Sequence, residues 1–257
     1  MIELSHKPLI RAYRMDCMGF MADKPDGCYP LAIVDPPYGI GMDGGNVGYR
    51  GFNNFEKKDW DQEKPPKAYF ENLFRISDNQ IIWGGNYFGL PPTRGFIVWD
   101  KGRGFKGRTY AEGELAWTSF DRNAQIFEWD PLARGDYHGK INPCQKPVSL
   151  YRWLLTNYAK PGQTILDTHG GSFSSAIACW HEGYDVDIVE IDEEYFEAAC
   201  ERFERETRQL NMFSRGAQQV IAQNEQNKNV SVGNDKDFWW RRGESNPRPI
   251  PDSKASG

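Results

Sequence analysis

Short apolar runs bounded by glycine, proline or polar residues recur along the chain and predict β-strands. They lie at residues 9–13, 31–34, 80–83, 96–99, 115–118, 164–166 and 186–189. Between them, apolar residues spaced three and four apart predict helices that follow Pro66, Pro147 and Asp192, and a further helix that carries Ile177 and Trp180. Strands that alternate with helices are typical of a mostly parallel α/β sheet, which binds its ligands at the carboxyl ends of the strands.

The pattern predicts one domain followed by a tail. A chain of 257 residues with 39% hydrophobic residues is long enough to bury one sizeable core. The periodic pattern stops near Phe213, so we expect the domain to span residues 1–213. Residues 214–257 are rich in Asn and Gln and end in a stretch with several prolines. They have little periodicity and are predicted to be a disordered or appended tail.

Charge and cysteine content narrow the class of protein. A net charge of −5 argues against a general basic coat, although residues 101–108 hold four positive charges among glycines. With the aromatic and basic residues of 120–141, this loop is interpreted either as a surface for DNA phosphates or as an ordinary solvated loop. The five cysteines form no C-x-x-C pair, which favours a reduced, cytoplasmic protein without a metal site. No apolar run approaches the length of a membrane span and no signal peptide is recognisable, so no membrane association is expected.

One strand end carries a concentrated set of candidate catalytic residues. Asp35 follows the apolar run 31–34, and Pro36, Pro37 and Tyr38 come next. The two prolines fix two φ angles and remove two backbone donors, so this loop has few conformations. A carboxylate, free carbonyl groups and an aromatic ring on a rigid loop can hold a planar ring that bears an amino group.

A second informative stretch, residues 145–203, is interpreted as a βαβ unit with a glycine-containing first turn. Such a turn lets a cofactor approach the backbone, and an acid at the end of the second strand can hold ribose hydroxyl groups. The unit lacks G-x-G-x-x-G, so a nicotinamide cofactor is not favoured. The glycine-containing turn after the first strand and Glu190 at the end of the second strand are therefore the candidate binding positions.

Asp35-Pro-Pro-Tyr38 resembles the catalytic motif of the amino-group DNA methyltransferases, which modify adenine N6 or cytosine N4. The S-adenosylmethionine site of the same family has a Lys-Pro pair before a helix and then a glycine turn, which resembles this chain at Lys146, Pro147, Asp167, Gly171 and Ser172. The resemblance assigns these residues to cofactor binding, with Glu190 at the position of the ribose acid. The family's Asp-Cys pair after the first strand is matched by Asp16 and Cys17, which the resemblance assigns to the adenine pocket of the cofactor. Phe173 departs from the pattern, because the family has glycine there.

The resemblance covers roughly residues 9–210, with the motifs in the permuted order of the beta class. It implies a Rossmann-like S-adenosylmethionine-dependent fold with helices on both faces of the sheet. A catalytic half (about 9–119), a target-recognition insert (about 120–141) and a cofactor half (about 142–213) would follow one another. The implied function is site-specific methylation of double-stranded DNA, with the base rotated out of the duplex. By family resemblance, Asp35 as the first motif residue favours adenine N6.

Several alternatives stay open. The same mechanism could act on cytosine N4, and Phe173 is compatible with a DNA-binding relative whose cofactor site has decayed. Pro143-Cys144-Gln145 resembles the nucleophile motif of cytosine C5 methyltransferases, although it lies before the cofactor turn instead of after it. Methyltransferases of the same fold that act on RNA or on protein glutamine usually carry Asn-Pro-Pro-Tyr. No nuclease signature is recognisable, so a solitary modifier is the hypothesis, as a monomer or a homodimer.

Overall fold

The computed structural model describes residues 8–44, 55–208, 238–241 and 248–249. The elements follow one another as β1 (Leu9–Arg14), α1 (Cys17–Ala22), β2 (Leu31–Val34), α2 (Lys67–Ile76), β3 (Gln80–Trp83), the 3₁₀ helix η1 (Gly85–Tyr87), β4 (Ile97–Asp100), β5 (Gly113–Thr118), β6 (Gln125–Glu128), α3 (Val148–Tyr158), β7 (Thr164–Asp167), α4 (Ser174–Glu182), β8 (Asp185–Glu190), α5 (Glu193–Thr207), β9 (Phe238–Arg241) and β10 (Arg248–Pro249). The predicted strands and helices are therefore present, with bounds that differ by a few residues.

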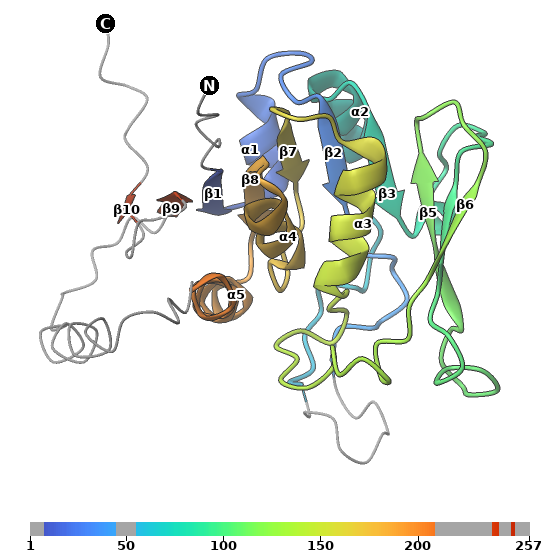
Figure 1. Ribbon diagram of the computed structural model, residues 1–257. Coiled ribbons are helices and arrows are strands. Elements are labelled where there is room, and N and C mark those ends of the chain that lie inside the picture. Colours follow the sequence, from blue (N-terminus) through green and yellow to red (C-terminus); the bar gives the residue numbers. More distant parts are fainter. Residues whose placement is uncertain (1–7, 45–54, 209–237, 242–247, 250–257) are drawn as a thin grey trace, which may run out of the picture.

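All strands belong to one sheet, in the order β10-β9-β1-β8-β7-β2-β3-β5-β4-β6. The five central strands from β1 to β3 are parallel to one another, whereas β5 pairs antiparallel with both β3 and β4. The carboxyl ends of the parallel strands point in one direction and form one edge (Figure 1).

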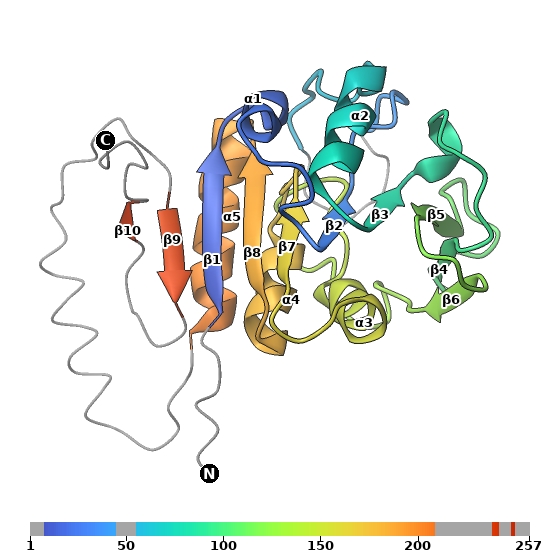
Figure 2. The same ribbon diagram turned by 90° about the horizontal axis from the view of Figure 1, so that it is seen from above.

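Helices cover both faces of the sheet, as predicted (Figures 1 and 2). Strand β2 shows why, because its four residues are all buried and alternate between two cores. Leu31 and Ile33 pack in the cluster that includes α3, α4 and α5, and Ala32 and Val34 pack with α1 and α2. The mostly parallel α/β fold with helices on both faces is therefore confirmed.

Several elements were not predicted from the pattern, including the short helices α1 and η1. Strand β6, where no strand was predicted, pairs parallel with β4 at the edge of the sheet. In the predicted tail, β9 pairs antiparallel with β1 and β10 pairs with β9, so these short segments extend the sheet. The rest of residues 214–257 lies outside the described residues. None of the helices in the described part of the chain combines the length and apolarity needed to cross a bilayer.

Candidate active site

A cavity of about 540 Å³ lies where the carboxyl ends of β2, β7 and β8 meet, and its volume is in the range typical of small-molecule sites. Eight of the residues predicted from the sequence line it: Asp35, Pro36, Pro37, Tyr38, Lys146, Gly171, Ser172 and Glu190. The two motifs therefore meet in one cavity, because parallel strands end at the same edge of the sheet.

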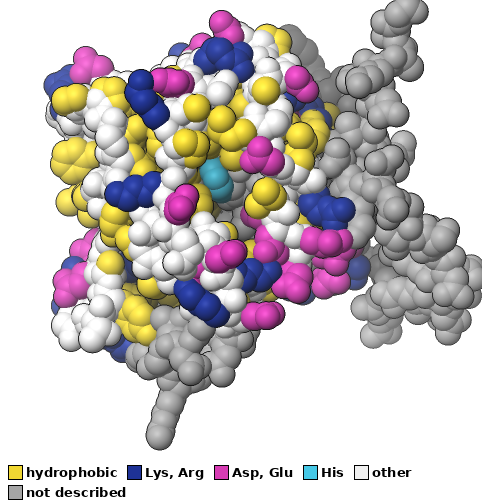
Figure 3. All heavy atoms as spheres, turned by 180° about the vertical axis from the view of Figure 1, so that it is seen from behind, with side chains coloured by type: hydrophobic (Ala, Val, Ile, Leu, Met, Phe, Trp, Pro, Cys, Tyr) yellow, Lys and Arg dark blue, Asp and Glu magenta, His cyan; other side chains and the backbone are white. Residues whose placement is uncertain are grey.

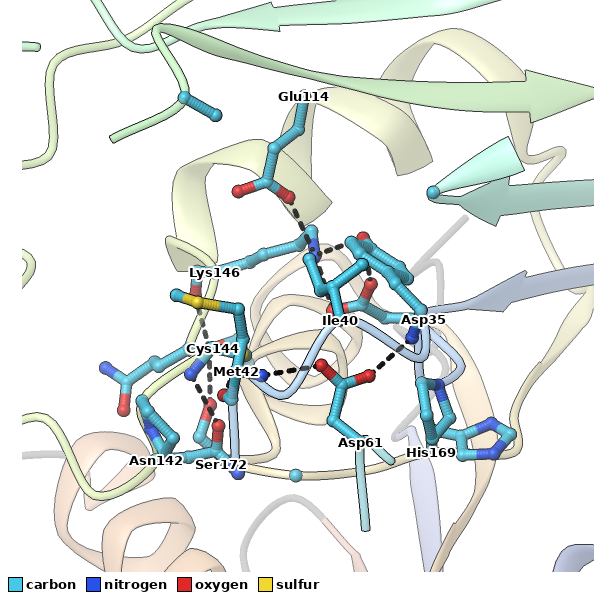
Figure 4. Close-up of a pocket in the computed structure, with 18 of the residues that line it drawn as sticks. Asp35, Ile40, Met42, Asp61, Glu114, Asn142, Cys144, Lys146, His169 and Ser172 are labelled. Atoms are coloured by element: carbon cyan, nitrogen blue, oxygen red, sulfur yellow. Dashed lines mark hydrogen bonds and ion pairs between the residues drawn. The ribbon is translucent and has the colours of Figure 1, made fainter. Parts of the chain in front are cut away.

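The loop from Asp35 to Tyr38, predicted to be catalytic, is held by hydrogen bonds to its acid and to its backbone (Figure 4). Tyr38 Oη donates to Asp35 Oδ1 at 2.7 Å, and Lys146 Nζ lies 2.5 Å from Asp35 Oδ2. The carboxylate of Asp61 accepts from the backbone N–H groups of Tyr38 at 2.7 Å, Gly39 at 2.9 Å and Met42 at 2.8 Å. Asp61 thereby fixes the loop after the two prolines. Sequence reasoning missed it, because residues 40–64 are rich in glycine and have no apolar periodicity.

The ring of Tyr38 lies directly against the backbone of Gly84. Gly84 has a φ of +68°, and a Cβ atom built on it would lie 2.2 Å from the ring. The ring also stacks on Tyr87, with centroids 5.0 Å apart and an interplanar angle of 15°. The turn after β3 therefore accommodates and orients the aromatic ring of the catalytic loop.

A chain of buried and half-buried charges continues from Asp35 to β5. Lys146 Nζ lies 3.1 Å from Glu114 Oε2, and Lys101 Nζ lies 2.6 Å from Glu114 Oε1. Burial raises the pKa of Asp35, although Lys146 opposes that shift. Burial would also raise the pKa of Glu114, but Lys146 and Lys101 together lower it to about 2. Burial disfavours the Lys146 ammonium, yet both carboxylates raise its pKa overall, so the side chain is charged.

This network changes the interpretation of Lys101, whereas the other three positive charges of the loop at 101–108 are exposed. Lys101 is buried against Glu114 and Phe105 is buried as well, so both belong to the wall of the cavity and not to a solvated surface. Seen from behind the view of Figure 1, the described surface mixes acidic and basic side chains around a hollow with hydrophobic walls (Figure 3). On that face the described residues form no continuous basic patch.

The predicted cofactor turn is tied to the end of β8. Gly171 N donates to Glu190 Oε2 at 2.7 Å, and Asp192 N donates to Glu190 Oε1 at 2.8 Å. From α5, the buried Arg202 donates from Nη1 to the carbonyl oxygen of Ser172 at 2.8 Å. Arg202 was also missed, since an arginine in a helix rich in charged residues carries no sequence signal of burial.

Phe173 occupies the left-handed region at φ 58° and is fully buried. Its ring packs edge-on against Phe196, with centroids 5.7 Å apart, and it is not among the residues that line the cavity. Where the resembling family has glycine, this chain therefore has a phenylalanine with a left-handed backbone, and its side chain lies in the core. The cavity stays open beside it.

Four predicted binding residues lie outside the cavity lining: Asp16, Cys17, Pro147 and Asp167. Asp16 caps α1 and accepts from Gly19 N at 3.2 Å, and Cys17 Sγ lies 4.0 Å from His169 Nε2, a ring that does line the cavity. Pro147 is the residue before α3.

Asp167 is buried under the turn. It accepts from Ser175 Oγ at 2.5 Å and from His169 N at 3.1 Å, and burial raises its pKa to about 7. In this structure Asp167 supports the backbone of the turn, and its side chain does not face the cavity.

Cys144 lines the cavity but is poorly suited to be a nucleophile. Its thiol donates to the carbonyl oxygen of Met42 at 3.3 Å. Burial raises the pKa of Cys144 to about 12, so the thiol stays protonated at neutral pH, and only the thiolate attacks efficiently. This environment disfavours the C5-cytosine alternative.

The geometry defines an α/β domain with an acid-proline-proline-tyrosine loop and a glycine turn in one cavity. Residues 97–201 match the model of the DNA methylase family, N6_N4_Mtase, which confirms the resemblance to amino-group DNA methyltransferases over that part of the chain.

Solved structures of similar proteins include the M1.HpyAVI–SAM complex, where SAM is S-adenosylmethionine. It has 18% identity and a TM-score of 0.49, over 75% of this chain and 99% of that chain. TTHA0409 of Thermus thermophilus, complexed with S-adenosyl-L-methionine, has 17% identity and a TM-score of 0.47, over 76% of this chain and 93% of that chain. The cytosine-N4-specific PvuII DNA methyltransferase has 14% identity and a TM-score of 0.48, over 77% of this chain and 89% of that chain.

Proposed function

We propose that this protein is a site-specific DNA methyltransferase that modifies the exocyclic amino group of a flipped base, most readily adenine N6. The observation that carries the proposal is the presence of Asp35, Tyr38, Gly171 and Glu190 in a single cavity. The family match over residues 97–201 supports the same class of reaction.

The donor set of the cavity fits S-adenosylmethionine. Glu190 ends β8 with its carboxylate fixed by two backbone N–H groups, and its remaining lone pairs can accept from ribose hydroxyl groups. Gly171 allows close approach to the turn, at a φ of 51°. When bound, this cofactor supplies an electrophilic methyl group on a positively charged sulfur.

The catalytic loop would orient the base. The Asp35 carboxylate and the Pro36 carbonyl would accept the two amino hydrogens, which directs the lone pair of the nitrogen toward the methyl group. Tyr38 would stack on the base in place of Tyr87, which stacks on its ring in this structure. No covalent bond between enzyme and base is needed, so alignment and electrostatics would supply most of the acceleration. Preference for adenine rests on the Asp of the motif, by resemblance, and N4-methylation of cytosine is the second candidate.

The test is methylation of unmethylated genomic DNA with methyl-labelled S-adenosylmethionine, followed by digestion to nucleosides. We expect label in N6-methyladenine, lost in Asp35→Asn and kept in Cys144→Ser. Calorimetry separates the steps, because Asp35→Asn should still bind S-adenosylmethionine whereas Glu190→Ala should bind it at least tenfold more weakly. Label in N4-methylcytosine would correct the base, and label in 5-methylcytosine that requires Cys144 would refute the mechanism. If the DNA carries no label and the protein does not bind the cofactor, the result would favour a DNA-binding relative whose cofactor site has decayed.

A further inference from the structure

Lys146 places a buried ammonium group beside the carboxylate that would hold the amino group. Its side chain is only 4% exposed, yet it lines the cavity, and its Nζ lies 2.5 Å from Asp35 Oδ2. The family resemblance assigned Lys146 to the cofactor site, as part of a Lys-Pro pair. Its ammonium group instead contacts the catalytic loop and Glu114 on β5 (Figure 4).

We propose that Lys146 recognises the ring nitrogen next to the target amino group, and that Glu114 is its positioning residue. The inference rests on the proposed function, since it identifies how the same site selects its base. Adenine and cytosine both carry an amino donor next to a ring-nitrogen acceptor on the Watson–Crick edge. Guanine and thymine carry the reverse, a carbonyl oxygen next to a ring N–H. An acceptor from Asp35 beside a donor from Lys146 matches only the first pair of bases.

The hydrogen bonds of the ammonium group leave room for this contact. The ammonium has three hydrogens, and it contacts Asp35 Oδ2 at 2.5 Å, Glu114 Oε2 at 3.1 Å and Tyr38 Oη at 3.3 Å. The contact with Tyr38 is the longest, so a ring nitrogen can replace that oxygen at little cost. Each Asp35 oxygen also keeps a lone pair for an amino hydrogen, because Oδ1 and Oδ2 receive one hydrogen each from Tyr38 and Lys146.

Glu114 explains why the ammonium stays in place. It reaches Lys146 from the opposite side of the cavity, and its second oxygen is held by Lys101 at 2.6 Å. Two carboxylates and two ammonium groups then compensate one another in a buried setting, where an unpaired charge would be costly. Without the Glu114 carboxylate, the Lys146 ammonium should shift toward Asp35. Its hydrogens would then no longer point toward the ring nitrogen of the base.

The experiment compares two duplexes that contain the target site found by nucleoside analysis. One carries the natural base and the other carries 1-deaza-2′-deoxyadenosine, in which C–H replaces N1. A cytosine target would use 3-deaza-2′-deoxycytidine. We expect kcat/KM of the wild-type enzyme to fall about tenfold to a hundredfold on the analogue, because one base-reading hydrogen bond is lost.

The variants show whether Lys146 is the donor. Lys146→Met keeps the aliphatic stem of the side chain. It should slow methylation of both duplexes, and the ratio of its kcat/KM on the natural duplex to that on the analogue duplex should approach one. Glu114→Gln should also lower the ratio, whereas Lys106→Met, which changes an exposed lysine paired with Asp100, should keep the wild-type ratio. Thermal melts identify any variant that does not fold, and the wild-type ratio remains informative in that case.

A wild-type ratio below twofold, or an equal ratio in wild type and Lys146→Met, would overturn the inference and leave Lys146 as a structural ion pair. Failure of the proposed function is distinguishable, because it would appear as no methylation of the natural duplex by the wild-type enzyme.

Discussion

Phe173 combines two opposing contributions to stability, and replacing it with glycine measures their balance. A non-glycine residue in the left-handed region costs about 1–2 kcal/mol, and Phe173 has a φ of 58°. Removing a buried phenylalanine ring costs about 3–5 kcal/mol, because the packing and a cavity are lost. The ring is fully buried against Phe196. Glycine also adds about 0.5–1 kcal/mol of backbone entropy to the unfolded chain. Phe173→Gly should therefore destabilise the protein by about 3 kcal/mol, although it restores the residue of the resembling family.

Urea unfolding at neutral pH, followed by circular dichroism, measures this difference. In a thermal melt the same change should lower Tm by about 6–12 °C, at roughly 2–4 °C per kcal/mol for a domain of this size. Phe173→Ala is the matched control, because it loses the ring and keeps a Cβ atom in the left-handed region. It should be less stable than Phe173→Gly by about 1 kcal/mol. A Phe173→Gly protein as stable as the wild type would refute the reasoning, since burial of the ring would then contribute nothing.

Three further predictions concern the site. Gly84→Ala places a Cβ 2.2 Å from the Tyr38 ring, so the rate of methyl transfer should fall at least tenfold in a steady-state assay. The affinity for S-adenosylmethionine should stay within about twofold of the wild-type value. An unchanged rate of methyl transfer would contradict the close approach of the Tyr38 ring to Gly84. Arg202→Met leaves the buried carbonyl of Ser172 without its charged donor and should lower the free energy of unfolding in urea by about 2–3 kcal/mol. A decrease below about 0.5 kcal/mol would contradict that role. The pKa of Asp167 is raised by burial to about 7, so the native state binds more protons than the unfolded state between about pH 4 and pH 7. The stability that this group contributes is present at low pH and is lost as pH rises through 7. The free energy of unfolding of Asp167→Asn should therefore rise relative to that of the wild type over this window. A difference between the two proteins that does not change with pH would refute the raised pKa of Asp167.

The amino-acid sequence determined the order of strands and helices and the position of both motifs. Strand β2 shows how, because a short apolar run that stops at an acid and two prolines can form only a buried strand followed by a rigid loop. The glycine turn and Glu190 were predicted in the same way, from the end of one apolar run and the end of the next. Parallel strands then bring their ends together, so the meeting of Asp35 with Gly171 followed from local patterns.

The partners of Asp35 were decided only by the tertiary structure. Asp35 and Lys146 are 111 residues apart, and Glu114 lies on β5, which pairs antiparallel with β3. Asp61 comes from a stretch without a regular pattern. Periodicity reports which face of an element is buried, but it does not report which charged side chains the folded chain brings within hydrogen-bond distance. The direction of Phe173 was decided in the same way, since a left-handed backbone and a space beside Phe196 exist only once the core has packed.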